Sequence, residues 1–178
     1  MESRKHRREE KIKDKKSYIL ISFVISIILL RMFVFFVVKI PSESMMPTLN
    51  VNDRLIATKV YDPEKLERGD IVIFYSKEEN QLMIKRLIGL PGDIVYINNG
   101  YVSVNGEQIN ESYIYSKDDF SGRYRVPKDE YFFLGDNRSN SYDSRMWKNP
   151  FIKAEDIKGK AILKIYPFKN IRRLDNSI

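Results

Sequence analysis

The sequence contains no cysteine and only one histidine, His6, in its 178 residues. The lack of cysteine excludes a disulfide framework, a thiol nucleophile and cysteine-ligated zinc. A Ser-His-Asp triad needs an imidazole beside the serine, and a catalytic zinc site normally needs histidine ligands. His6 lies in a charged run, residues 1–16, at the start of the chain. A hydrolase of this sequence would therefore use Lys, Asp, Glu or Tyr as its base, and we expect neither a metal nor any other cofactor.

Positive charge is concentrated in the same run. The formal net charge of the chain is +7, and residues 1–16 carry eight Lys or Arg against four acids, so the remainder is nearly balanced. A basic protein can bind nucleic acid. A basic run directly before an apolar one is instead typical of the cytoplasmic flank of a membrane segment. We therefore expect no nucleic-acid partner, and a salt-dependent binding assay would test that alternative.

The apolar run covers residues 17–38 and contains one charge, Arg31. A membrane-spanning helix needs about 20 predominantly apolar residues. The sequence thus predicts a cytoplasmic tail over residues 1–16, a single anchor over residues 17–38, and an extracytoplasmic domain over residues 39–178 of a cell-membrane protein. A charge at the bilayer centre costs at least about 2.5 kcal/mol. Arg31 can avoid this cost by extending to the outer interface, which would shorten the span.

A cleaved signal peptide is the alternative interpretation of this run. Its charged start fits, but no small-x-small cleavage site follows, and residues 39–42 (Lys-Ile-Pro-Ser) are a poor substitute. An uncleaved anchor is therefore favoured.

The remainder of the chain is typical of β structure. Asn99-Gly100 and Asn105-Gly106 are strong hairpin signals, and Pro91-Gly92 marks another turn. Pro63–Arg68 and Ala154–Ile157 are the candidate helical pieces. We expect a compact, mostly antiparallel β domain or barrel. The predicted strands are Arg54–Val60, Asp70–Tyr75, Gln81–Ile88, Asp93–Ile97, Tyr101–Val104, Tyr131–Leu134 and Lys160–Tyr166.

Three polar clusters hold the candidate chemistry. Two serines, Ser42 and Ser44, lie between prolines just after the apolar run; Lys85 lies in a predicted strand; and residues 135–145 are dense in short polar side chains. Each has an ordinary explanation when taken alone. The serines suit a loop leaving a membrane, the lysine suits an edge strand, and the polar run suits a surface loop with Asx turns.

Strand alternation gives Lys85 a second interpretation. Met83, Lys85 and Leu87 would share one strand face. Burial among apolar neighbours disfavours the ammonium form and can lower a lysine pKa by up to about 3–5 units. A lysine so perturbed is a general base at neutral pH. The acids are less suggestive, because Asp70, Asp93 and Asp136 each follow a glycine at a turn, where aspartate is common.

Taken together, these clusters resemble the type I signal peptidase family, in its short Gram-positive form. The family carries Pro-Ser-x-Ser-Met-x-Pro-Thr after its anchor, a Gly-Asp strand, Lys-Arg followed by Gly-x-Pro-Gly-Asp, and Gly-Asp-Asn-Arg followed by Ser-x-Asp-Ser-Arg. All occur here in the family order. The matching segments are Pro41–Thr48, Arg68–Val72, Lys85–Asp93, Gly135–Arg138 and Ser141–Arg145.

The resemblance implies roles for individual residues. Ser44 matches the nucleophile and Lys85 the general base of a serine/lysine dyad. Ser42 matches an oxyanion-hole hydroxyl that assists the backbone N–H of Ser44. Ser141 matches a hydroxyl that orients the lysine.

Four further residues match structural positions near the family's site. Asp143 and Arg145 match an ion pair, and Asp136 is expected to pair with Arg86.

The implied function is that of a membrane-bound serine endopeptidase. Such an enzyme removes N-terminal signal peptides from exported preproteins after small-x-small sites, through an acyl-enzyme. Its partners would be preproteins, membrane lipid and the protein export machinery. Two alternatives remain: a self-cleaving repressor-type Ser/Lys protease, against which the anchor argues, and an inert membrane-anchored β scaffold, which would have no need of Ser44 and Lys85.

Overall fold

The computed structural model describes residues 2–114 and 116–174, and it describes side chains outside residues 2–14 and 30–32. The chain separates into two compact units, which meet between Phe36 and Val37. Each unit is treated by itself below. Predictions about the basic tail and about Arg31 concern side chains outside the described set.

The first unit consists mainly of helix α1 (Glu2–Phe33). Its apolar side chains between Tyr18 and Leu29 are exposed. Within the described residues, no helix combines the length and the apolar character needed to span a membrane. The predicted helical span of 17–38 also needs correction, because the helix ends at Phe33 and Phe35–Lys39 is a strand, β1. Its sequence, Phe-Phe-Val-Val, consists of aromatic and β-branched residues that favour strands.

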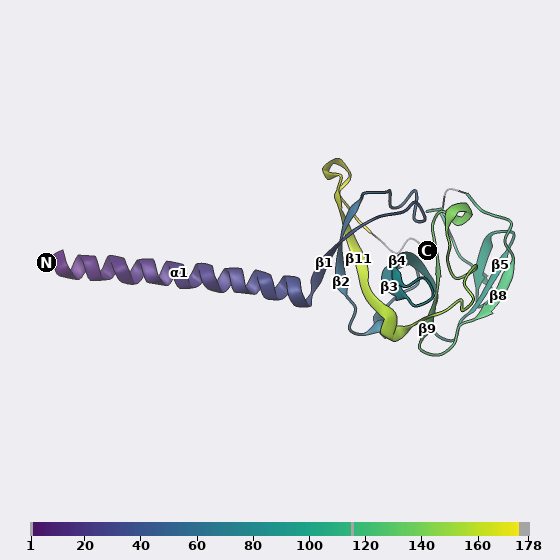
Figure 1. The fold of residues 1–178 in the computed structure, drawn as a ribbon, viewed down its shortest axis with the longest axis horizontal. Coiled ribbons are helices and arrows are strands. Elements are labelled where there is room, and N and C mark those ends of the chain that lie inside the picture. Colours follow the sequence, from purple (N-terminus) through teal and green to yellow (C-terminus); the bar gives the residue numbers. More distant parts are fainter. Residues whose placement is uncertain (1, 115, 175–178) are drawn as a thin grey trace. The chain divides into compact units, whose positions relative to one another are not determined.

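Two antiparallel sheets form the second part of the chain (Figure 1). The larger sheet has the order β1, β2 (Arg54–Lys59), β11 (Ile157–Tyr166), β3 (Ile71–Ser76), β4 (Gln81–Gly89), β9 (Glu130–Leu134) and β10 (Ile152–Lys153), with β12 (Arg172–Arg173) paired to β11. The smaller sheet has the order β7 (Glu107–Gln108), β6 (Tyr101–Val104), β5 (Ile94–Asn98) and β8 (Gly122–Arg125). The prediction of a mostly antiparallel β domain is confirmed, in the form of two sheets.

All seven predicted strands are present, within a few residues of the expected bounds. The two helical pieces are 3₁₀ turns, η1 (Pro63–Lys65) and η3 (Ala154–Asp156), and two more occur at η2 (Arg138–Asn140) and η4 (Phe168–Asn170). Five strands were not predicted: β1, β7, β8, β10 and β12. Three of these are only two residues long, which is too short for an alternating pattern to be recognised.

The hairpin signals act as predicted. Asn99 and Gly100, between β5 and β6, have φ values of 47° and 73°, and Asn105 and Gly106, between β6 and β7, have 54° and 91°. Both residues of such a turn need positive φ, which asparagine and glycine tolerate best. These two turns join β5, β6 and β7 as a meander, and β8 pairs with the other edge of β5.

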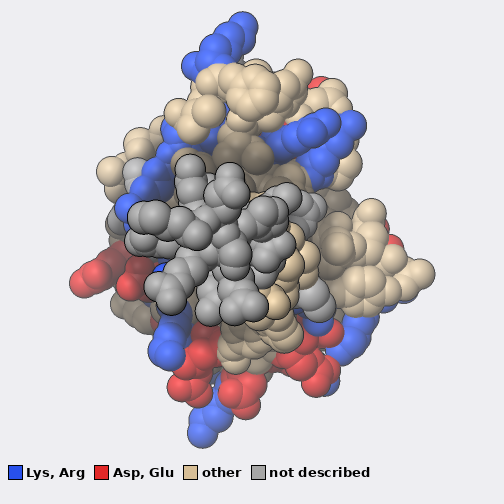
Figure 2. Space-filling view, turned by 90° about the vertical axis from the view of Figure 1, so that its left-hand side faces the viewer, with Lys and Arg blue, Asp and Glu red and all other residues tan. Residues whose placement is uncertain are grey.

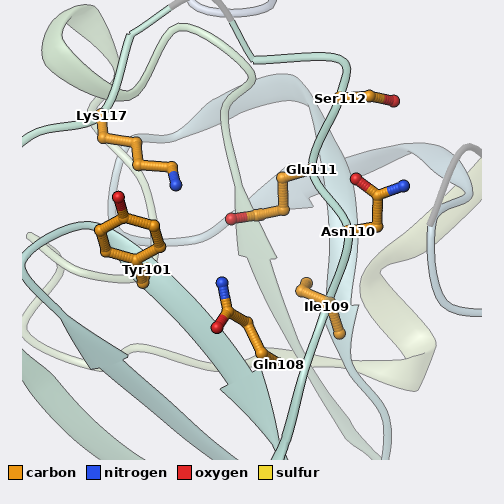
Figure 3. A pocket seen from close by; sticks show the side chains of 7 residues that line it. All are labelled: Tyr101, Gln108, Ile109, Asn110, Glu111, Ser112 and Lys117. Atoms are coloured by element: carbon orange, nitrogen blue, oxygen red, sulfur yellow. The ribbon is translucent and has the colours of Figure 1, made fainter.

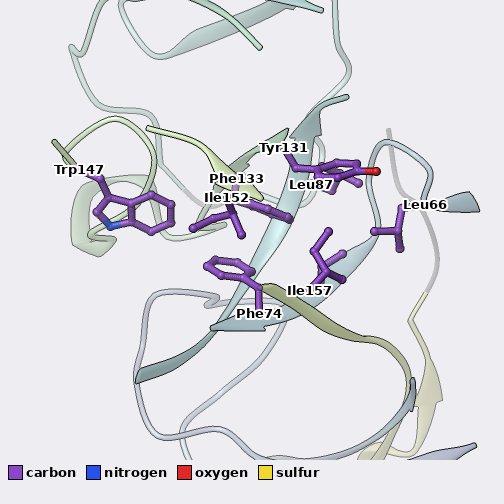
Figure 4. Packing of buried hydrophobic residues seen from close by; sticks show 9 residues of the cluster. Leu66, Phe74, Leu87, Tyr131, Phe133, Trp147, Ile152 and Ile157 are labelled. Carbon is purple, nitrogen blue, oxygen red and sulfur yellow. The ribbon is translucent and has the colours of Figure 1, made fainter. Parts of the chain in front are cut away.

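Buried side chains form two clusters, one on each side of the strand pair β4–β9. The first surrounds Phe74, which stacks on Phe133 at 4.5 Å between ring centroids and meets the edge of Trp147 at 6.0 Å (Figure 4). The second includes Ile88 and Phe132, which neighbour members of the first cluster in sequence and therefore face the other way. Strands β4 and β9 are thus covered on both faces.

Charges of both signs are spread over the surface. On the face drawn in Figure 2, acidic side chains gather along the lower edge, and Lys and Arg lie in several separate places. Among the described residues coloured in this view, the basic side chains therefore do not form one continuous patch.

Candidate active site

Ser44 lies in a closed loop between β1 and β2. The loop is closed by two backbone hydrogen bonds of 2.9 Å, in which Ile40 N–H donates to Asp53 and Asn52 N–H donates to Ile40. Ile40, Met45 and Leu49 are fully buried and fix the loop to the domain. Ser44 is therefore held on a rigid segment, with only 8% of its surface exposed.

A buried ion pair supports the far end of this loop. The Asp53 carboxylate accepts a hydrogen bond of 2.8 Å from the Lys164 ammonium of β11 and another of 2.8 Å from the Asn50 N–H. Asp53 and Lys164 are both almost fully buried. The position of the Ser44 loop is therefore tied to the central strand β11 of the larger sheet.

Lys85 is the buried lysine of β4. It lies opposite Val72 of β3 and is 3% exposed. Met83 and Leu87, on the same strand face, pack in the first cluster. Burial lowers the pKa of the Lys85 ammonium from 10.5 to about 8. A measurable fraction of this side chain is therefore a neutral amine at neutral pH.

The polar segment 135–145 lies against the Ser44 loop. The Asn137 N–H donates to the Ser44 carbonyl at 3.1 Å, and its side-chain amide donates to the Glu43 carbonyl at 3.2 Å. The Asn140 amide donates to the Glu43 carboxylate at 3.2 Å. Two segments about ninety residues apart in sequence are thereby joined at the serine.

Gly135 is the point at which these segments meet. A Cβ at this position would lie 2.1 Å from Ser141 Oγ and 2.5 Å from the Ser44 carbonyl oxygen. The β4–β9 ladder ends where Arg86 pairs with Leu134, so Lys85 and Gly135 are the next residues of the two segments. The absence of a side chain at Gly135 therefore lets Ser44 and Ser141 approach its backbone closely, beside the end of the ladder next to Lys85.

Three polar groups near this point are weakly paired or unpaired among the described residues. Ser42 Oγ makes only a long hydrogen bond of 3.4 Å with Ser44 Oγ. Ser141 Oγ is buried and has no hydrogen-bond partner among the described residues. Within the described part of the chain, no backbone acceptor takes the Ser44 N–H. Buried polar groups are normally paired, so these groups are available for a ligand or for a reacting side chain.

Arg86 and Asp136 form a buried ion pair beside the site. Arg86 Nε and Nη2 donate to the two carboxylate oxygens of Asp136 at 2.8 and 2.7 Å, and Nη1 donates to the Gly69 carbonyl at 2.9 Å. Both side chains are at most 2% exposed. This pair joins the strand that carries Lys85 to the residue that follows Gly135.

Asp143 and Arg145 form a second buried pair. Arg145 Nε and Nη2 donate to Asp143 at 2.8 and 2.9 Å, and Asp143 also accepts the Gly135 N–H at 2.9 Å. Asp143 raises the pKa of Lys85 and Arg145 lowers it, after the larger effect of burial. Because the two charges oppose each other, burial decides the direction.

Comparisons with known proteins show the family of this chain. The family of signal peptidases, peptidase S26, matches residues 14–166. Relatives include signal peptidase I of Leptolyngbya laminosa, 43% identical over 76% of this chain and 70% of the relative, and signal peptidase I P of Bacillus subtilis subsp. natto, 39% identical over 93% and 98%. This chain belongs to the signal peptidase family.

A solved signal peptidase I from Enterococcus faecalis is also similar. It is 32% identical, with a TM-score of 0.47, over 54% of this chain and 96% of that one. The resemblance to the signal peptidase family inferred from the motifs is confirmed by the family match and by the relatives.

The structure brings the predicted site residues of this signal peptidase family member into one region. Ser44 and Ser141 contact Gly135, and Ser42 lies beside Ser44; Arg86, Asp136, Asp143 and Arg145 form two ion pairs at the same turn, and the charges of Asp136, Asp143 and Arg145 also act on Lys85. Gly135 itself was not predicted as a site residue. The available signal was a glycine directly after an apolar strand, which often marks a close backbone approach.

The residues that the structure describes contain no group of three His, Cys, Asp or Glu side chains that could hold a metal ion.

Proposed function

We propose that this chain is a membrane-bound serine endopeptidase that cleaves signal peptides from exported preproteins after small-x-small sites, with Ser44 as nucleophile and Lys85 as general base. The observation that carries the proposal is the buried Lys85, whose pKa is lowered to about 8, on the strand beside the loop that carries Ser44. A lysine in that state can accept a proton where histidine is unavailable.

The proposed reaction has two stages. In the first, neutral Lys85 accepts the Ser44 Oγ proton while Oγ bonds to the scissile carbonyl carbon. The carbon–nitrogen bond then breaks, and the leaving amine takes the proton from the Lys85 ammonium. In the second, Lys85 accepts a proton from water, whose oxygen attacks the acyl ester, and the proton returns to Ser44 Oγ. Lys85 and Ser44 are regenerated.

The negative oxygen formed at each stage needs hydrogen-bond donors. We assign this role to the Ser44 N–H and the Ser42 hydroxyl. The unpaired N–H and the 3.4 Å separation of the two serine oxygens support the assignment. Prearranged donors of this kind are typically the largest single contribution to such catalysis.

Ser141 is assigned the task of orienting Lys85. Its buried hydroxyl has no partner among the described residues and lies against Gly135. A buried hydroxyl without a hydrogen bond lowers stability, so we expect the Ser141 hydroxyl to bond to a group of the working enzyme. The Arg86–Asp136 and Asp143–Arg145 pairs are assigned a structural role, since both hold residues next to Gly135.

Membrane attachment forms a further part of the proposal. We assign the helical part of residues 17–38, which ends at Phe33, to the anchor, residues 1–16 to the cytoplasm and residues 39–178 to the outside of the cell. The basic run before an apolar run supports this topology. Lipid and the export machinery would then be neighbours of the site. Protease added outside wall-free cells should digest the 39–178 portion, and protection of that portion would contradict the topology.

The central experiment uses the full chain solubilised in detergent and a preprotein with a small-x-small site. The chain should cleave after that site, and Ser44→Ala should abolish cleavage. Ser103→Ala, on the smaller sheet, is the matched control and should retain full activity. An inactive wild-type chain, or an active Ser44→Ala variant, would contradict the proposal.

A further inference from the structure

Residues 109–114 and 116–121 connect β7 to β8 and are called the crossing segment here. At its two ends, Ile109 and Phe120 pack against the second cluster. Between them the segment borders a cavity of about 410 Å³, where the Lys117 ammonium lies 3.2 Å from the centre of the Tyr101 ring (Figure 3). Apolar packing thus fixes the ends of the segment, and polar contacts must fix its middle.

The middle of the crossing segment contacts the three arginines that surround the proposed catalytic residues. Each arginine meets a different residue of the segment, and each is almost fully buried. The contacts are Tyr113 with Arg86, Glu111 with Arg138, and Asp118 with Arg145.

We propose that Tyr113 and Glu111 are positioning residues of the peptidase site, which fix the Gly135–Asp136 turn against Ser44 and keep water away from Lys85. This inference rests on the proposed function. It gives a role to the crossing segment, which lies in sequence between Lys85 and residues 135–145 and belongs to neither of these polar clusters.

Tyr113 acts through the Arg86–Asp136 pair. The Arg86 guanidinium lies 3.9 Å from the centre of the Tyr113 ring, a distance at which a cation is attracted to the ring face. The ring therefore covers an ion pair whose two members are at most 2% exposed. If water reached one side of this ion pair, its two side chains would be held less precisely and their attraction would weaken.

Glu111 acts through Arg138. Its carboxylate pairs with the Arg138 guanidinium and accepts the Tyr113 hydroxyl at 2.9 Å. Burial raises the pKa of that hydroxyl, so it stays a neutral donor. Arg138 Nε in turn donates to the Gly135 carbonyl at 3.1 Å. With its N–H bound to Asp143, Gly135 is held on both sides of its backbone.

The consequence for Lys85 follows from its position next to Arg86, whose strand partner Leu134 directly precedes Gly135. The charged groups that act on Lys85 are Asp143 and Asp136, which favour its protonated form, and Arg145, which disfavours it. Loosening the turn would admit water beside the amine and weaken the burial that lowers its pKa. The lysine would then return toward its ordinary value of 10.5 and be protonated more fully at neutral pH.

The experiment measures kcat and KM for preprotein cleavage across pH, with thermal unfolding recorded for every variant. Tyr113→Leu removes both the ring face and the hydroxyl, Tyr113→Phe keeps the ring, and Glu111→Gln keeps the shape but not the charge. Tyr96→Leu, an exposed tyrosine of β5, is the matched control. We expect Tyr113→Leu to lower kcat by about 10-fold or more with little change in KM, because small misplacements are costly in rate.

The pH profile separates positioning from general stability. In Tyr113→Leu the rise of kcat/KM with pH should move to higher pH, whereas Tyr113→Phe and Tyr96→Leu should keep the wild-type midpoint. If Tyr113→Leu does not fold, Glu111→Gln decides: a lower kcat at unchanged KM supports the inference, and wild-type kinetics overturn it.

Failure of this inference can be distinguished from failure of the proposed function. A wild-type chain that cleaves in a Ser44-dependent way, with unchanged kcat and midpoint in folded Tyr113→Leu, overturns the inference alone. A wild-type chain without Ser44-dependent cleavage overturns the proposed function.

Discussion

The backbone N–H of Asn137 donates a hydrogen bond to the carbonyl of Ser44 over 3.1 Å. Together with the two side-chain amide bonds to Glu43, this bond joins the loop that precedes β2 to the loop that follows β9. It fixes the peptide plane on the C-terminal side of Ser44, while the Ser44 N–H keeps no acceptor among the described residues. The geometry of the proposed oxyanion hole therefore depends on the 135–145 segment as much as on the serine loop.

Gly135→Ala should inactivate the enzyme. The added Cβ would lie 2.1 Å from Ser141 Oγ and 2.5 Å from the Ser44 carbonyl oxygen, so both segments must move apart. Overpacking of this kind typically costs about 1–3 kcal/mol of stability, and a displacement of 1 Å can cost roughly 10²-fold in rate.

The control for that variant is Gly106→Ala, at a hairpin turn with φ of 91° and no atom within 4 Å of the new Cβ. It should lower the unfolding temperature but leave preprotein cleavage intact. Full activity of folded Gly135→Ala would show that the close approach is not needed.

The rate should depend on pH through Lys85. Only the neutral amine accepts the Ser44 proton, so kcat/KM should rise as pH increases and level off above the lysine pKa of about 8. A kinetic pH series on the detergent-solubilised chain gives the midpoint. A midpoint near 10.5 would mean that Lys85 is solvated in the working enzyme, and a rate that falls across this range would exclude it as the base.

Ser42→Ala should slow cleavage without abolishing it. One donor to the developing oxyanion is lost, which typically costs about 10²–10³ in kcat, while the Ser44 N–H remains. KM should change little, because the bond is made mainly in the transition state. Single-turnover cleavage of a preprotein measures the step directly. Unchanged turnover would remove Ser42 from the oxyanion hole, and complete loss in a folded variant would give it a larger role.

Removing one member of the buried Arg86–Asp136 pair should destabilise the protein more than replacing both members. Asp136→Asn leaves a buried guanidinium without its counterion and should cost about 3–5 kcal/mol. Replacing both members by apolar residues, Arg86→Met with Asp136→Leu, should recover much of that loss. Denaturant unfolding of the single and double variants compares the free energies. An equal loss of unfolding free energy in the single and the double variant would mean that the two side chains do not act as a pair.

Much of the fold could be predicted from the sequence. The seven predicted strands and the two Asn-Gly turns have local signals, namely alternation and residues that tolerate positive φ. Arg31 predicts a span shorter than residues 17–38, but the end of α1 at Phe33 itself has no clear signal, because the residues from Met32 to Val38 are all apolar. Only the β propensity of Phe35–Lys39 hints at the change, and short apolar runs are ambiguous between helix and strand.

The candidate site could be predicted in part, because its residues lie in dense short motifs. The roles of Ser44 and Lys85 are implied by the family resemblance of these motifs, while the sequence itself argues only against a histidine base and gives Lys85 apolar neighbours by strand alternation. Tyr113 and Glu111 could not be found this way. Glu111 meets Arg138 across 27 residues, and neither it nor Tyr113 lies in a repeating pattern or a recognisable motif. Such contacts become visible only when the chain is folded.

The most direct test of the Ser44–Lys85 dyad is preprotein cleavage by two Lys85 variants. Lys85→Arg keeps a positive charge that cannot deprotonate, and Lys85→Met keeps only the apolar volume. Both variants should fold, and both should lose Ser44-dependent cleavage at every pH. Lys85→Met should unfold at or above the wild-type temperature near pH 7, because no buried amine has to be desolvated. Retained cleavage by folded Lys85→Arg would contradict the account, since a guanidinium cannot take the Ser44 proton.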